Sequence, residues 1–335
     1  MYEDPQYKFE LYTQLKNEKK EKEKKDIRRV AGFTGLAFLI MLFLPQVVNI
    51  ISVNVALLFG VCDEYVAFIS DPFGLQIFQI IYSLMVFILP FTVISAGCNK
   101  KVRNTVSFKL PEKESFLPLF LMAIGFCAFA NITTNIIGNI YASFGINFTA
   151  PENPLPQGAL GIVISLLSTA IVPALTEEFA LRGEVMGSAK CMGDGYAIVF
   201  SAILFGIMHG NFVQMPFAFV MGLAIGFAVI KTGSLWTGIL IHFVNNAVSV
   251  ILDYAFSAIS SAELQNAVMC IYFALCFVCF FIGLLLSRKN KGIWQLENVK
   301  SECTLSEKAI AYFTSPPLLI AIVIFCVQSY EYVVF

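Results

Sequence analysis

Residues 267–287 read AVMCIYFALCFVCFFIGLLLS, a run of 21 residues without a charged side chain. A helix rises ~1.5 Å per residue, so a run of this length can cross the ~30 Å hydrocarbon core of a bilayer. The rest of the chain has the same character, because 58% of its 335 residues are hydrophobic, 13% are charged and the mean hydropathy is +0.76. Soluble domains contain about 25% charged residues. The sequence therefore predicts an all-α fold, a polytopic membrane bundle of about eight to nine transmembrane helices.

Nine apolar runs account for this expected bundle. They cover residues 30–61, 74–97, 116–144, 159–188, 195–209, 216–230, 234–252, 267–287 and 317–335. The first run is expected to break near Pro45. The fifth and sixth are shorter than the ~20 residues of a straight span, which predicts a hairpin that turns within the bundle. The ends of the last run are not defined, because Pro316 and Pro317 interrupt it.

The charged residues divide the chain into a cytosolic N-terminal segment, residues 1–29, and a membrane domain, residues 30–335. With the N-terminus in the cytosol, all 22 Lys and Arg residues fall on the inner side of the expected spans. The outer connections 62–73, 145–158 and 253–265 contain acidic residues and no basic ones. This distribution obeys the positive-inside rule and predicts an integral membrane protein with a cytosolic N-terminus.

The overall charge balance limits the classes of partner. The chain has 22 basic and 23 acidic residues and a net charge of −1, which argues against a nucleic-acid partner. Most of the nine cysteines lie inside apolar runs, as small apolar residues do, so no disulfide framework is expected. The lipid bilayer is the partner that composition predicts directly.

Ionisable residues inside membrane spans are costly and therefore point to function. The fourth run contains Thr176–Gly183, TEEFALRG, in which Glu178 and Arg182 have the i,i+4 spacing of a helical ion pair. Glu177 has Leu181 at its own i+4 position and so lacks a local partner. We expect Glu178 and Arg182 to be structural and Glu177 to be available for proton transfer. The alternative is that both glutamates simply pair with basic residues at one end of the bundle.

Two histidines and an asparagine extend this candidate site. His209 ends the fifth run, whereas His242 and Asn246 share one face of the seventh, and the chain contains no other histidine. The distance of each residue along its helix can be counted from the expected inner turn at ~1.5 Å per residue. It is ~17 Å for Glu177, ~21 Å for His209, ~14 Å for His242 and ~20 Å for Asn246. The four residues are thus predicted to share one layer. Hydrogen-bonded packing is the alternative role for each histidine.

Three motifs in this region resemble those of a known family. EEFALR fits the pattern E-E-x-x-x-R, FGIMH fits F-x-x-x-H, and HFVNN fits H-x-x-x-N/D. In this order, within apolar runs over residues 159–252, they resemble the CPBP intramembrane proteases. That family includes the type II CAAX prenyl endopeptidases and bacteriocin-processing or immunity proteins. The resemblance implies a catalytic core at about 159–252 and, as a location, a bacterial plasma membrane.

The resemblance also implies roles for individual residues. Glu177 and His209 would activate the hydrolytic water, His242 and Asn246 would stabilise the oxyanion, and Glu178 and Arg182 would hold the site. The reaction would be endopeptidase cleavage within the membrane, in a site open to the cytosolic side. The substrate would be a peptide or protein, with a prenylated C-terminus or of the bacteriocin type. No cofactor is certain, but Zn²⁺ could be bound by His209, His242 and Glu177.

Other functions and features stay open at the level of sequence. A non-catalytic immunity protein, or a transporter that moves protons or ions through the Glu/His layer, would use the same residues. Transporters often have repeated halves, and we find no internal repeat. A stripe of Asn131, Asn135 and Asn139 on the third run predicts hydrogen bonds between helices, or the lining of a substrate cavity. The biological role, whether processing or immunity, and the oligomeric state do not follow from the sequence.

Overall fold

The structure, a computed structural model, describes residues 5–98, 108–149 and 154–334, and these are almost entirely helical. The helical elements are α1 (Pro5–Phe59), α2 (Cys62–Ser70), α3 (Pro72–Ile88), α4 (Thr92–Gly97), α5 (Lys113–Ser143), α6 (Gly158–Ser165), η1 (Leu166–Ile171), α7 (Val172–Glu178), η2 (Phe179–Met186), α8 (Gly187–Ala189), η3 (Lys190–Met192), α9 (Asp194–Ile207), α10 (Gln214–Thr232), α11 (Leu235–Ala258), α12 (Ala262–Ser287), α13 (Leu305–Phe313) and α14 (Pro316–Tyr330). Two short strands, β1 (Asn147–Phe148) and β2 (Val333–Val334), pair antiparallel.

The all-α polytopic bundle is confirmed. Within the described residues, seven helical segments are long and apolar enough to cross a membrane. An eighth results if α13 and α14, which meet at 74°, form one bent span. The count reaches only the lower end of the expected range because α9 has 14 residues, fewer than a span needs. Helices α9 and α10 pack against each other as the expected hairpin, but α10, with 19 residues, is itself one of the seven candidate spans.

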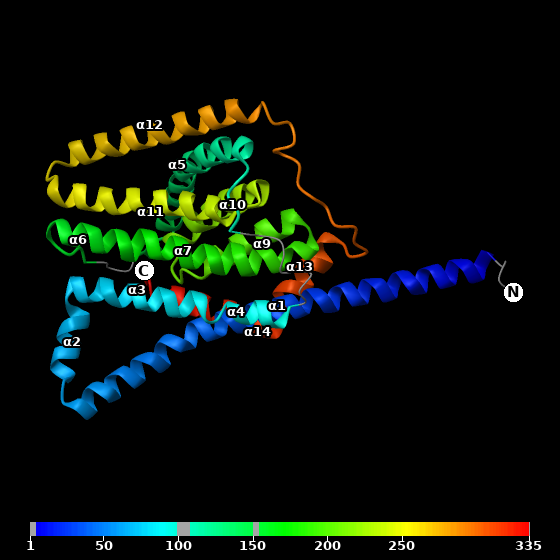
Figure 1. Cartoon of the computed structure of the whole chain (residues 1–335), viewed down its shortest axis with the longest axis horizontal. Coiled ribbons are helices and arrows are strands. Elements are labelled where there is room, and N and C mark those ends of the chain that lie inside the picture. Colours follow the sequence, from blue (N-terminus) through cyan, green and yellow to red (C-terminus); the bar gives the residue numbers. More distant parts are fainter. Residues whose placement is uncertain (1–4, 99–107, 150–153, 335) are drawn as a thin grey trace.

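The first helix differs from the expectation. The charged segment and the first apolar run form one continuous helix, α1, which passes through Pro45 without the expected break. A proline removes only one helical hydrogen bond, and the long flanking turns compensate for that loss. Its charged half extends beyond the bundle (Figure 1), yet it is not simply solvated, because Glu307 of α13 lies 2.8 Å from Lys20 and 3.4 Å from Lys24.

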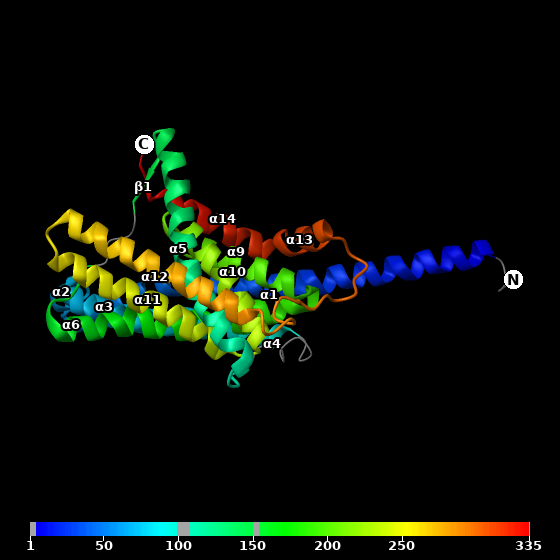
Figure 2. The same ribbon diagram turned by 90° about the horizontal axis from the view of Figure 1, so that it is seen from above.

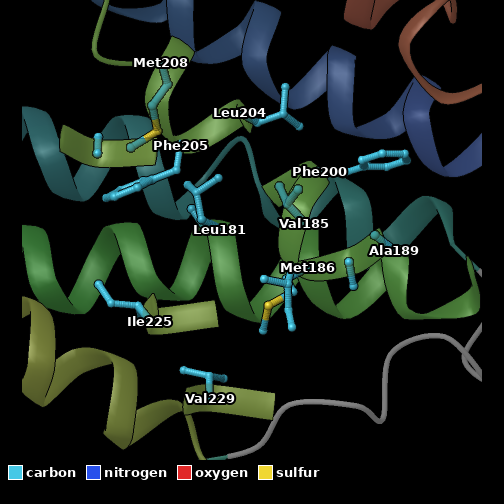
Figure 3. Packing of buried hydrophobic residues seen from close by; sticks show 14 of the residues in the cluster. Leu181, Val185, Met186, Ala189, Phe200, Leu204, Phe205, Met208, Ile225 and Val229 are labelled. Atoms are coloured by element: carbon cyan, nitrogen blue, oxygen red, sulfur yellow. The ribbon is translucent and has the colours of Figure 1, made fainter. Parts of the chain in front are cut away.

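Buried apolar side chains hold the centre of the bundle together. Leu181 and Val185 of η2 pack with Phe200 and Leu204 of α9 (Figure 3). Helices α9 and α10 approach closely at Gly222, where an added β-carbon would lie 3.0 Å from Ala202. Figure 2 shows α5 inclined steeply to α11 and α12, and it packs against both α12 and α10. This frame fixes α7, α9 and α11, which carry the candidate site.

The bundle has two ends of opposite charge. One end, to the right in Figure 1, contains segments with basic residues that hydrogen bonds join together, and we call it the basic end. These bonds link Arg29 to Gly97, Lys231 to Gly292 and Gln295, Lys308 to Met192, and Ser234 to Lys109. The acidic end contains α2, the turn between α11 and α12, and the paired strands β1 and β2. Residues 99–107 and 150–153, which belong to an expected inner and an expected outer connection, lie outside the described residues.

Candidate active site

The four residues predicted to share a layer line one cavity. Glu177, at the end of α7, His209, just after α9, and His242 and Asn246 of α11 all border a cavity of about 480 Å³. This volume lies within the ~300–1,000 Å³ of typical ligand pockets. The structure therefore brings together residues that are up to 69 positions apart in the sequence.

The expected ion pair between Glu178 and Arg182 is present and is completely buried. Arg182 Nη1 donates to Glu178 Oε1 over 2.8 Å, and both side chains are 0% exposed. The same carboxylate oxygen lies 2.9 Å from Nδ1 of His242. The sequence predicted the pair but not the contact with His242, which comes from a helix far away in the chain. Glu178 thus links the buried arginine to a cavity histidine.

Phe205 contacts both the buried arginine and the two histidines. The sequence analysis named it only as the first residue of the motif F-x-x-x-H. The Arg182 guanidinium lies 4.3 Å from the centre of its ring, a cation–π distance. The rings of His209 and His242 meet the same phenyl group nearly edge-on, with centroids at 5.1 and 5.8 Å. Phe205 therefore packs against Arg182 and both histidine rings at once.

Hydrogen bonds define the tautomer of each histidine, and so which ring nitrogen is left for the cavity. His209 Nδ1 lies 2.7 Å from the carbonyl oxygen of Phe205, which can only accept, so this nitrogen carries the hydrogen. His242 Nδ1 faces the carboxylate of Glu178 and is a donor for the same reason. In a neutral imidazole the other nitrogen, Nε2, then holds the lone pair. Both Nε2 atoms remain available for chemistry in the cavity.

Asn246 is held by a backbone carbonyl group in an irregular part of the neighbouring helix. Its Nδ2 donates to the Thr169 oxygen over 2.9 Å. Thr169 lies within the π-helical turn η1, the kind of irregularity that is common at functional sites. Asn246 has a second amide hydrogen, which this contact leaves free.

The two adjacent glutamates differ as predicted. Glu178 is fully buried, whereas Glu177 is partly exposed and lines the cavity. Among the described residues, Glu177 takes part in no hydrogen bond or ion pair, in contrast to the two partners of Glu178. The helix places the two side chains ~100° apart, so only one can join the buried pair. Glu177 is therefore the carboxylate that can meet water.

Further amide side chains line the cavity beside these residues. Asn245 Nδ2 donates to Asn246 Oδ1 over 3.0 Å, and its own oxygen lies 3.2 Å from Cys127 Sγ. Asn131 also lines the cavity, but its amide nitrogen donates to the Cys127 carbonyl of its own helix, as that of Asn135 donates to Asn131. The expected hydrogen bonds between helices are thus not what holds these two groups. Asn245 was missed, although it adjoins Asn246 in the sequence.

The residues named for a possible zinc site do not form one in this structure. Among the described residues, no three His, Cys, Asp or Glu side chains are grouped closely enough to hold a metal ion. His209, His242 and Glu177 border the same cavity, but they face it as separate groups rather than as a set of ligands. The chemistry they support directly is proton transfer and hydrogen bonding.

The cavity extends from the layer of Glu177, His209, His242 and Asn246 toward the acidic end. On α11 its lining residues run from His242 to Phe256, close to the turn into α12, and on α12 they are Met269 and Tyr272, near the start of that helix. The lining therefore extends toward the end of the bundle opposite the basic connections. The expected opening of the site to the cytosolic side stays a prediction.

Comparison with known proteins supports the resemblance seen in the motifs. Residues 159–248 match the family model described as "Type II CAAX prenyl endopeptidase Rce1-like". This part of the chain is similar to the CAAX-type membrane peptidases. A protein of Bacillus subtilis (strain 168), named "Putative membrane peptidase YdiL", is 26% identical over 148 residues, which cover 42% of this chain and 59% of that protein. No solved structure matches the chain.

Proposed function

We propose that the chain is an intramembrane endopeptidase in which Glu177 and His209 activate water. One observation carries this proposal: Glu177, His209, His242 and Asn246 line a single cavity, beside a glutamate–arginine pair that also binds His242. The similarity to membrane peptidases over residues 159–248 supports the reaction class. The substrate is a peptide or protein, since that is what such enzymes hydrolyse.

The proposed reaction uses Glu177 first as a base and then as an acid. A water molecule donates a hydrogen bond to Nε2 of His209 and loses a proton to Glu177, while its oxygen adds to the carbonyl carbon of the scissile bond. The electron pair of the C=O bond moves to the oxygen. When this tetrahedral intermediate collapses, the C–N bond breaks and the amine takes the proton from Glu177. The products are an amine and a carboxylic acid, which then loses its proton to water to become a carboxylate.

The negative oxygen of the intermediate needs hydrogen-bond donors. Asn246 can offer the amide hydrogen that Thr169 leaves free. His242 can donate from Nε2 only when its ring carries both protons, because Nδ1 already donates to Glu178. The carboxylate of Glu178 compensates the positive charge of that form. Glu178 and Arg182 are therefore positioning groups in this mechanism and do not touch the reacting atoms.

A peptide-release assay on purified protein tests the proposal. Glu177→Gln keeps the size of the side chain but removes the proton acceptor, so cleavage of a synthetic peptide mixture, followed by mass spectrometry, should disappear while the protein stays folded. Glu112→Gln, exposed just before α5, is the matched control and should cleave normally. Treatment with a chelator should leave the wild-type rate unchanged. Cleavage by Glu177→Gln at the wild-type rate would show that the base is another group.

A further inference from the structure

We propose that Cys127 and Asn245 are positioning residues that fix which end of the Asn246 side-chain amide faces the reacting carbonyl group. The inference rests on the proposed peptidase function, in which Asn246 donates to the oxyanion. The two residues act through Asn246 rather than on the reacting atoms. They do so through a chain of hydrogen bonds that joins three helical elements, α5, α11 and η1.

The two ends of an asparagine side chain have opposite hydrogen-bonding roles. The amide nitrogen donates, the amide oxygen only accepts, and a half-turn of the amide group exchanges their places. A donor stabilises an oxyanion, whereas an acceptor repels it. Asn246 can therefore serve the reaction only if its surroundings hold the amide in one of these two orientations.

The backbone carbonyl group of Thr169 determines the direction of the whole chain. This oxygen can only accept, so Asn246 must turn its amide nitrogen toward it, at 2.9 Å. The Asn246 oxygen then faces Asn245, whose amide nitrogen donates to it over 3.0 Å. The Asn245 oxygen in turn faces Cys127, so the thiol is the donor over the last distance of 3.2 Å.

This chain opposes a half-turn of the Asn246 amide. Successive residues of a helix point ~100° apart, so Asn245 can face α5 while Asn246 faces η1, and α11 packs against both. A half-turn of Asn246 alone would set its oxygen against the Thr169 oxygen and its nitrogen against the Asn245 nitrogen. Both hydrogen bonds of the amide would then be lost. If Asn245 turned as well, its nitrogen would meet the Cys127 thiol, which is only a weak acceptor.

Cys127 is suited to its place because its thiol hydrogen is directed to the neighbouring helix. Its Sγ lies 3.2 Å from Asn245 Oδ1 but 3.9 Å from the carbonyl oxygen of Ala123, one turn earlier in α5. Hydroxyl side chains in helices often donate to that earlier carbonyl group instead. Cys127 is only 2% exposed and is not among the described residues that line the cavity. It can therefore influence the reaction only through Asn245.

Infrared spectroscopy of the purified protein tests the chain without any substrate. In each protein, the difference from its own Cys127→Ala form isolates the S–H stretching band of Cys127. A donated hydrogen bond lowers the frequency of this band, so Asn245→Ala should raise it. Asn246→Ala should shift or broaden it, because the Asn245 amide then loses the acceptor that fixes its orientation. Asn135→Ala, also on α5, is the control and should leave it unchanged.

The turnover of a cleaved peptide tests the positioning role. Cys127→Ala should lower kcat about two- to tenfold, the range of one net hydrogen bond, with KM nearly unchanged because the oxyanion exists only during the reaction. Asn245→Ala should lower kcat at least as much. Cys127→Ser should recover most of the loss, since a hydroxyl group also donates, and Cys127→Val is the second apolar variant should the alanine variant not fold. Cys276→Ala removes another buried thiol and should keep the wild-type kcat.

A double-mutant cycle separates positioning from simple packing between α5 and α11. In an Asn246→Ala background, neither Cys127→Ala nor Asn245→Ala should lower kcat further, because both act through the amide that is already missing. Additive losses would overturn the proposal, and so would a wild-type kcat in Cys127→Ala or an S–H band that Asn245→Ala does not move. A wild type that cleaves no peptide would instead refute the peptidase function, and the infrared band would still decide whether the chain exists.

Discussion

At the scale of single residues, Gly238 is a position where one added atom should disable the site. A β-carbon there would lie 2.7 Å from Glu178 Oε2 and 2.7 Å from Val229 Cγ2, so Gly238→Ala must push the carboxylate away from Arg182 and His242. We expect peptide release to fall strongly and the free energy of unfolding to drop by ~1–3 kcal/mol, as in other overpacked cores. Gly226→Ala is the control, since its β-carbon would make ordinary contacts of 3.4 Å or more. Equal behaviour of the two variants in thermal unfolding and peptide release would contradict this.

Asn246 is the second residue whose environment predicts a specific kinetic effect. If it donates to the oxyanion, Asn246→Ala should lower kcat by ~10²–10³ and leave KM nearly unchanged, because the oxyanion exists only during the reaction. Asn135→Ala, on the exposed face of α5, should change neither constant. Asn246→Asp should keep partial activity that rises as the pH falls, because only a protonated carboxyl group can donate. An effect of Asn246→Ala on KM alone would make Asn246 a substrate contact.

At the scale of elements, the π-helical turn η1 connects backbone geometry to the site. The Thr169 carbonyl of this turn accepts a hydrogen bond from Asn246, and Pro173, which has no N–H, prevents a regular α-helix through the turn. Pro173→Ala would allow a regular helix, in which residue 173 donates to the Thr169 carbonyl in competition with Asn246, so we expect turnover to fall while the melting temperature stays the same or rises. Pro118→Ala, inside α5, is the control and should leave turnover unchanged. Full turnover of Pro173→Ala would mean that Asn246 is held without this carbonyl.

At the scale of the whole molecule, the sequence predicted the elements better than the contacts between them. Apolar runs located the helices because burial in a bilayer requires length and hydrophobicity, both of which are local properties. The pairing of Glu178 with Arg182 was also local, at i,i+4. The contact of Glu178 with His242, and that of Thr169 with Asn246, join residues 64 and 77 positions apart and so leave no local periodicity. The direction in which the cavity extends could not be predicted, because depth along a helix does not say which side of the layer is packed.

The orientation of the whole bundle in the membrane yields the last prediction. Hydrogen bonds of Lys231, Lys308 and Arg29 gather separate basic connections at one end, and cytosolic connections of membrane proteins are enriched in such residues. A reporter enzyme fused after Glu297 should therefore be active in the cytosol, and one fused after Ser261 should be active outside it. If both reporters exchange sides, the basic end faces outward, and the charge distribution of this chain breaks the positive-inside rule. The placement of the cavity relative to the basic end would remain, because helix packing within the bundle determines it independently of the membrane.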